Sequence, residues 1–147
     1  MKASKSIKNK IKTWEGFRPE AYLCPSGVLT IGYGHTGSNV KPGDTINHAQ
    51  AEELFEKDIA RFERELQDAM IADNINTLTQ GQYDALLSFA YNVGMSKLRS
   101  STLWRKVKAN PFDPTIGTEF CKWIYSGKNV LPGLVKRRRE EANIYRS

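Results

Sequence analysis

The feature that most constrains the fold of this chain is a long amphipathic stretch in its first half. Its apolar residues recur every three or four positions, which is the spacing of one face of an α-helix. Asn47 can cap this helix, which is about 35 Å long if it reaches Met70 and can therefore bridge two lobes. The apolar face consists of Ala51, Leu54, Phe55, Ile59, Phe62, Leu66 and Met70.

The residues before this stretch predict a short helix followed by a hairpin. The spacing of Ile7, Ile11 and Trp14 is helical, and we expect this helix to end at Glu15. Residues 21–34 are rich in β-branched and aromatic residues on both sides of a Pro-Ser-Gly turn, which is typical of a β-hairpin.

The second half of the chain predicts a series of helices. Thr79 and Gln82 form a capping-box pair ahead of an apolar helix that ends at Gly94. Two shorter helices are expected at 101–108 and 119–125, and a very basic one at 134–145. The expected fold class is therefore α+β and mostly helical.

The chain carries a net charge of +6, which favours polyanionic partners such as nucleic acid, an anionic membrane or an acidic cell wall. The same surplus can also serve only to keep the protein soluble. No recognised nucleic-acid-binding motif accompanies the charge, so we expect no nucleic-acid partner. With 39% hydrophobic residues, the composition is that of a folded domain rather than a disordered chain.

Cysteine and histidine are scarce. The two cysteines, Cys24 and Cys121, are too few for a disulfide scaffold and are expected to be free thiols. The two histidines and two cysteines show no ligand spacing, so neither a metal site nor a cofactor is expected. The first ten residues lack the apolar stretch of a secretory signal, which predicts a protein that stays in the cytoplasm until something releases it.

One short segment carries a specific constellation. Eight residues separate Glu15 from Cys24, and five separate Cys24 from Thr30. This segment, through His35, resembles the catalytic segment of phage endolysins of the T-even lysozyme type, glycoside hydrolase family twenty-four. Further similar stretches follow in order at 50–58, 78–94, 101–103, 122–123 and 131–141.

The resemblance implies a lysozyme-like fold within one domain of residues 1–147. It places a small catalytic β lobe at about residues 13–46 and a connecting helix at 47–70. A helical lobe at 71–147, with the N-terminal helix packed on it, completes the expected arrangement. The implied activity is that of a muramidase that cuts bacterial peptidoglycan and so lyses the host cell.

The implied acid is Glu15. Cleavage of a glycosidic bond requires an acid that protonates the leaving oxygen, and apolar walls such as Phe17 and Tyr22 favour the protonated carboxyl. The alternative, that Glu15 is an ordinary surface residue, is disfavoured because a negative charge at the end of a helix opposes the helix dipole.

Cys24 stands where many relatives carry Asp. A thiol with an ordinary pKa of about 8.5 is mostly neutral at neutral pH, so it needs a nearby cation to become a thiolate. Cys24 then has three open roles: base, nucleophile or inert strand residue. Thr30 is either a packed strand residue or, as the resemblance implies, a hydroxyl that holds a water below the sugar ring.

The resemblance also implies binding and orienting residues. Gly34, Tyr91 and Asn92 are implied to contact the saccharide, although Tyr91 also suits helical core packing. His35 is implied to pair with Asp58 as a structural contact. Arg137 is implied to approach and orient Glu15, and its two neighbours, Arg138 and Arg139, are expected to form a solvated basic face.

The expected partner is peptidoglycan, with weak contact to anionic membrane or wall and a monomeric state. Release to the wall is expected to need a separate holin-type pore. Two alternatives stay open at this point. One is a lytic transglycosylase, which forms an anhydro sugar instead of adding water. The other is a non-catalytic module that binds the wall or disrupts membranes.

Overall fold

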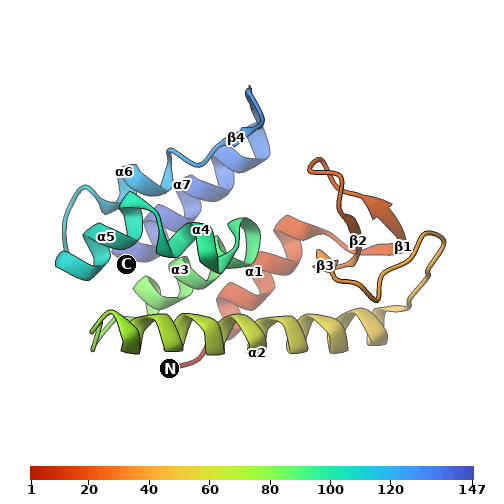
Figure 1. The fold of residues 1–147 in the computed structure, drawn as a ribbon, viewed down its shortest axis with the longest axis horizontal. Coiled ribbons are helices and arrows are strands. Elements are labelled where there is room, and N and C mark those ends of the chain that lie inside the picture. The colour runs from red at the N-terminus through yellow and green to blue at the C-terminus, as the bar shows by residue number, and fades with distance from the viewer. The chain divides into compact units, whose positions relative to one another are not determined.

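Helices and two small antiparallel sheets make up the chain, and the computed structural model describes residues 1–147 (Figure 1). This agrees with the expected α+β, mostly helical class. None of the helices combines the length and apolar character that a membrane crossing requires. The elements in order are α1 (Lys5–Glu15), β1 (Arg18–Leu23), β2 (Leu29–Gly32), β3 (His35–Thr36), α2 (His48–Ala72), α3 (Gln80–Val93), α4 (Met95–Arg99), α5 (Thr102–Ala109), α6 (Ile116–Phe120), β4 (Tyr125–Ser126), β5 (Asn129–Val130) and α7 (Pro132–Arg146).

Contacts between residues group the chain into two units. One comprises residues 8–61, and the other comprises residues 1–7 and 62–147. The boundaries fall inside α1 and α2, so each of these helices contributes residues to both units. The expected division into a β lobe, a connecting helix and a helical lobe stays a prediction.

The sheet of the 8–61 unit begins with the predicted hairpin. β1 pairs antiparallel with β2, and Tyr22 lies opposite Thr30. The sequence did not predict β3, which pairs with β2 and places His35 opposite Ile31. With only two residues, β3 is too short to show the alternation by which a strand is recognised.

Helix α2 follows the prediction closely. Asn47 and Gln50 cap its start reciprocally, because each backbone N–H donates to the side-chain oxygen of the other residue. Six of the seven residues of the predicted apolar face are buried, and Leu54 alone is half-buried. The long helix and its inward face were therefore readable from periodicity.

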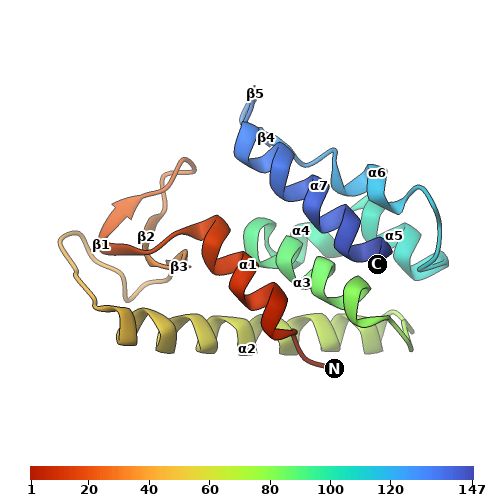
Figure 2. The ribbon, with the colours of Figure 1, turned by 180° about the vertical axis from the view of Figure 1, so that it is seen from behind.

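The core of the other unit forms around α3. The predicted capping box at Thr79 and Gln82 is present, and the helix ends at Gly94 as expected. Every residue from 82 to 90 is buried, so this helix is covered on all sides. Helix α7 lies beside α3 and α6 (Figure 2), and its residues Ala142 and Tyr145 join the same apolar core.

One helix prediction was wrong. The helix expected at 119–125 is instead α6, which spans Ile116–Phe120, and the chain then enters the β4–β5 hairpin. A short run of aromatic and β-branched residues does not distinguish helix from strand by periodicity alone. Helix α4 was also not predicted, and α7 begins earlier than expected, at Pro132, because proline suits the first turn of a helix.

The Thr79 cap gives a test of this fold. Thr79→Ala removes the acceptor of the Gln82 N–H and should lower the free energy of unfolding by about 1 kcal/mol. Denaturant titration measures the change. Thr77→Ala, in the exposed loop before the helix, is the matched control. Equal unfolding midpoints for the two variants would show that the cap contributes nothing.

Candidate active site

Glu15 ends α1, and the turn between β2 and β3 lies directly against its carboxyl group. A Cβ atom placed on Gly34 would lie 2.6 Å from Glu15 Oε1, closer than real Cβ contacts allow. Gly34 also has a φ of +81°, which L side chains rarely adopt. Both facts reserve this position for glycine, so Gly34 sets the space in which the carboxyl group lies.

Tyr22 of β1 is electrostatically coupled to Glu15. Burial is the main cause that raises the pKa of Tyr22, and the negative charge of Glu15 raises it further. The guanidinium of Arg18 lies 4.0 Å from the centre of the Tyr22 ring and acts in the opposite direction. Phe17, the other expected wall, stacks on His48 with ring centres 3.9 Å apart.

Cys24 follows β1 and has a hydroxyl group beside its sulfur. The distance between Cys24 Sγ and Ser26 Oγ is 2.9 Å. Burial acts to raise the pKa of Cys24, whereas the Ser26 side chain and backbone groups of Val28 and Ser26 lower it. Together with the side chain of Thr30 they bring the pKa to about 7. The activating groups are therefore hydrogen-bond donors, and not the cation that sequence reasoning called for.

Thr30 lies on β2 and is almost fully buried. Its Oγ1 donates a hydrogen bond to the backbone oxygen of Val28 over 2.9 Å, which leaves the lone pairs of the hydroxyl oxygen to accept. Its effect on the Cys24 pKa places the two side chains close together. One short stretch of the hairpin thus carries the Thr30 hydroxyl, the Cys24 thiol and the Ser26 hydroxyl.

The contact expected between His35 and Asp58 is present. His35 Nδ1 lies 2.8 Å from Asp58 Oδ2, and both side chains are largely buried. The other ring nitrogen, Nε2, lies 3.3 Å from Asn39 Oδ1. The imidazole is thus held at both nitrogens, and it joins β3 to α2 within the 8–61 unit.

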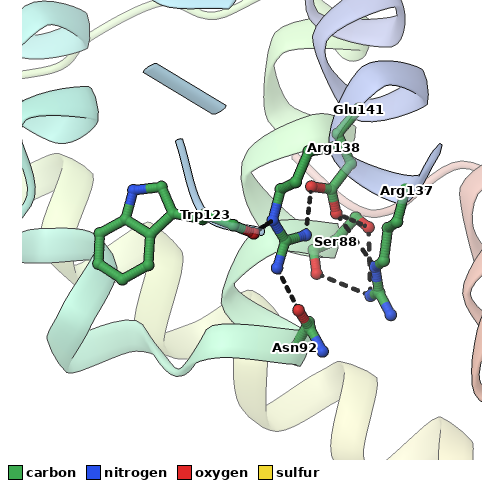
Figure 3. Close-up of polar contacts among 6 residues, drawn as sticks. All are labelled: Ser88, Asn92, Trp123, Arg137, Arg138 and Glu141. Atoms are coloured by element: carbon green, nitrogen blue, oxygen red, sulfur yellow. Dashed lines mark hydrogen bonds and ion pairs between the residues drawn. The ribbon is translucent and has the colours of Figure 1, made fainter. Parts of the chain in front are cut away.

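In the other unit, Tyr91 and Asn92 lie near the end of α3. Tyr91 is partly buried against the core, and its ring centre is 5.3 Å from that of Phe62. Asn92 is exposed, and its side-chain oxygen accepts a hydrogen bond from Arg138 (Figure 3). Because the oxygen is used in this way, the amide NH2 is the group that Asn92 has to offer as a donor.

Arg138 corrects the expectation of a solvated basic face. Its side chain is 1% exposed, and its nitrogens donate to Glu141 Oε1, to the backbone oxygen of Trp123 and to Asn92. The guanidinium carbon also lies 4.9 Å from the centre of the Phe89 ring. Burial lowers the pKa of Arg138, and the negative charge of Glu141 opposes this. Figure 3 shows the guanidinium group between Glu141, Asn92 and the backbone oxygen of Trp123.

Arg137 is also buried and shares the Glu141 carboxylate. Its Nε lies 3.3 Å from Glu141 Oε2, and its Nη2 donates to the backbone oxygen of Ser88 over 3.0 Å. The Ser88 hydroxyl donates to the same carboxylate over 2.5 Å. The expected approach of Arg137 to Glu15 stays a prediction. Arg139 is exposed, as expected.

A signal for this buried network was available in the sequence. Glu141 follows Arg138 by three residues and Arg137 by four, and residues with these spacings meet on one face of a helix. The signal for Ser26 was weaker, because its relation to Cys24 depends on the turn between them. No group of three or more His, Cys, Asp or Glu residues is arranged to hold a metal ion.

Comparison with known proteins places these residues in a family context. The phage lysozyme family model matches residues 12–141. The endolysin of Bacillus phage B103 is 42% identical over 99% of this chain, and the chain spans about half of that protein, 54% of its length. The endolysin of Acyrthosiphon pisum secondary endosymbiont phage 1 is 39% identical over 93% of this chain and 92% of that protein.

A solved structure gives the same result for the fold. The endolysin from Escherichia coli O157:H7 phage FAHEc1 is 32% identical and superposes with a TM-score of 0.82, over 99% of this chain and 93% of that one. The family-model match, residues 12–141, covers all residues of the candidate site.

The buried network predicts a large difference between adjacent arginines. Arg138→Met should lower the free energy of unfolding by about 3–5 kcal/mol, because it removes one of the cations that balance the buried Glu141 carboxylate. Arg139→Met, at the exposed neighbouring position, is the control and should have little effect. Chemical denaturation compares the two, and similar losses in both variants would contradict the importance of the network.

Proposed function

Because this chain belongs to the phage lysozyme family, we propose that it hydrolyses the glycosidic bond between N-acetylmuramic acid and N-acetylglucosamine in bacterial peptidoglycan. The observation that carries the proposal is the placement of Glu15 at a helix end, against Gly34, in the sheet-bearing unit that also presents Cys24 and Thr30. The surplus positive charge suits the approach to an acidic wall polymer.

In this proposal, Glu15 is the general acid. Its proton passes to the glycosidic oxygen as the bond to the sugar breaks and positive charge develops at the anomeric carbon. The raised pKa of Tyr22 keeps the phenol neutral beside the carboxyl group. Because Gly34 has no side chain, the carboxyl group can lie against the turn at this position.

Cys24 is proposed as the base that completes the reaction. A pKa of about 7 makes a large share of its side chain thiolate at neutral pH, which is the form that accepts a proton from water. Thr30 Oγ1 has acceptor capacity left after its bond to Val28, and this can hold the second hydrogen of that water. The water oxygen then bonds to the anomeric carbon.

The saccharide is proposed to contact Asn92 and Tyr91 as well as Gly34. The amide NH2 of Asn92 can donate to the carbonyl oxygen of an N-acetyl group, because Arg138 occupies the amide oxygen. Tyr91 offers a ring face of the kind that packs against sugars, although its contact with Phe62 gives it a structural role too.

Replacement of the acid tests the proposal directly. Glu15→Gln should abolish the release of new reducing ends from purified peptidoglycan, with a loss of at least about 100-fold, because the amide N–H is far too weak an acid to protonate the leaving oxygen. Glu20→Gln, at an exposed position of β1 in the same unit, is the matched control. Mass spectrometry of the fragments should show sugars with an added water, and anhydro sugars would instead identify a lytic transglycosylase.

A second outcome of that experiment separates catalysis from membrane disruption. If Glu15→Gln lysed cells as well as the unaltered protein without releasing reducing ends, the basic character of the chain would explain lysis and the hydrolase proposal would fail. The two activities are measured separately, on purified wall material and on intact cells.

The thiol predicts a particular dependence on pH. Activity should rise through pH about 7 as Cys24 loses its proton, because the thiol is half ionised at its pKa and the thiolate share increases above it. Cys24→Asp should move this rise toward lower pH, since a carboxyl group ionises near pH 4. Cys24→Ser should lose the activity, whereas Cys121→Ser, at an exposed thiol, should keep it. A fully active Cys24→Ser would reduce the thiol to a packing residue.

A further inference from the structure

The turn between β1 and β2 determines where Ser26 lies. The Gly27 N–H donates to the backbone oxygen of Cys24 over 2.8 Å, and the Cys24 N–H donates to that of Val28 over 3.0 Å. Residues 24–27 form a four-residue turn, and proline is favoured at the second position, which is Pro25. Gly27 occupies the fourth position with a φ of +83°. Ser26 is therefore held at the third position, two residues from Cys24.

The Ser26 side chain is directed at the sulfur. Ser26 is exposed in the turn, and its hydroxyl oxygen is 2.9 Å from Cys24 Sγ. Either atom can donate while Cys24 is a thiol, but a thiolate can only accept, so its bond from the hydroxyl is charge-assisted and stronger. This difference in strength favours loss of the thiol proton.

We propose that Ser26 is a positioning residue whose hydroxyl donates to the Cys24 sulfur and holds it as the thiolate that activates water. The catalytic part of this inference rests on the proposed function, whereas the link between the two side chains does not. Ser26 has no role in the site as described above beyond this contact, and neither the family resemblance nor the spacing of Glu15, Cys24 and Thr30 includes it.

Hydrogen-bonding groups, and not a cation, lower the pKa of Cys24. Tyr22 lies on the strand that leads to Cys24, and both the Glu15 carboxylate and the Cys24 thiolate act to raise its pKa. Arg18 lies over that phenol ring as the neighbouring cation. The groups that act directly to lower the pKa of Cys24 are the Ser26 side chain, backbone groups of Val28 and Ser26, and the Thr30 side chain. Ser26 is the most accessible of these to substitution.

The test measures thiol reactivity apart from hydrolysis. In a Cys121→Ser background, the rate at which iodoacetamide alkylates Cys24 is followed against pH by mass spectrometry. The midpoint should lie near pH 7 in this background and move toward the ordinary thiol value of about 8.5 in Ser26→Ala. Each unit of upward shift lowers the thiolate fraction below the midpoint roughly tenfold.

Two further variants make the result specific to the hydroxyl. Ser26→Thr keeps a hydroxyl and should retain the reactivity profile of the background. Ser38→Ala removes an exposed serine elsewhere in the same unit and should leave the profile unchanged. An unchanged alkylation profile in Ser26→Ala would overturn the inference.

Hydrolysis provides the second readout. The rise of wall-hydrolysing activity with pH should shift upward in Ser26→Ala by the same amount as the alkylation midpoint, because both report the thiolate. A shift in alkylation without one in hydrolysis would overturn the catalytic part of the inference. If the unaltered protein released no reducing ends at all, the proposed function would fail, and alkylation would still decide whether Ser26 controls the thiol.

Discussion

The close approach of Gly34 to Glu15 is the constraint on which the candidate site depends. A carboxyl group at the C-terminal end of a helix faces the negative end of the helix dipole, so the helix itself does not stabilise it as an anion. A Cβ atom on Gly34 would lie 2.6 Å from Glu15 Oε1, so a side chain there would displace the carboxyl group, and the φ of +81° also favours glycine. The carboxyl group of Glu15 thus lies against the backbone of the neighbouring sheet, and the contact of His35 with Asp58 joins that sheet to α2.

The unit that contains α3 and α7 uses buried charge for a comparable purpose. Glu141 is fully buried, yet two guanidinium groups and the Ser88 hydroxyl satisfy its oxygens, which offsets much of the cost of removing it from water. The exposed residue Asn92 is a member of this network, through the hydrogen bond that its side-chain oxygen accepts from Arg138. Because buried Arg138 binds the side-chain oxygen of Asn92, the orientation of the exposed amide is fixed. The core of this unit thus leaves the amide NH2 of Asn92 as the group that faces solvent.

Most of the helices could be predicted because their signals are local. The apolar face of α2, the capping box at Thr79 and the end of α1 at Glu15 each depend on residues a few positions apart. The two-residue strands β3, β4 and β5 could not be found, because their pairing partners and not their composition define them. The same limit applies to the site. The resemblance to a known family pointed to Glu15, Cys24 and Thr30, whereas the burial of Arg138 and the contact of Ser26 depend on tertiary packing and on the geometry of a turn.

The chemistry of the site turns on how a thiol can replace a carboxylate. An aspartate at this position would be ionised near neutral pH without help, whereas the pKa of a cysteine must be lowered by its surroundings before the thiol ionises there. A cation would serve, but in the proposed mechanism it would also favour the ionised form of the carboxyl group that acts as the acid. Hydrogen-bond donors of the turn avoid this conflict, since they act over a short distance on the sulfur alone. A thiol activated by neutral donors therefore suits the proposed division of roles, in which Glu15 is the acid and Cys24 the base, better than a thiol activated by a cation.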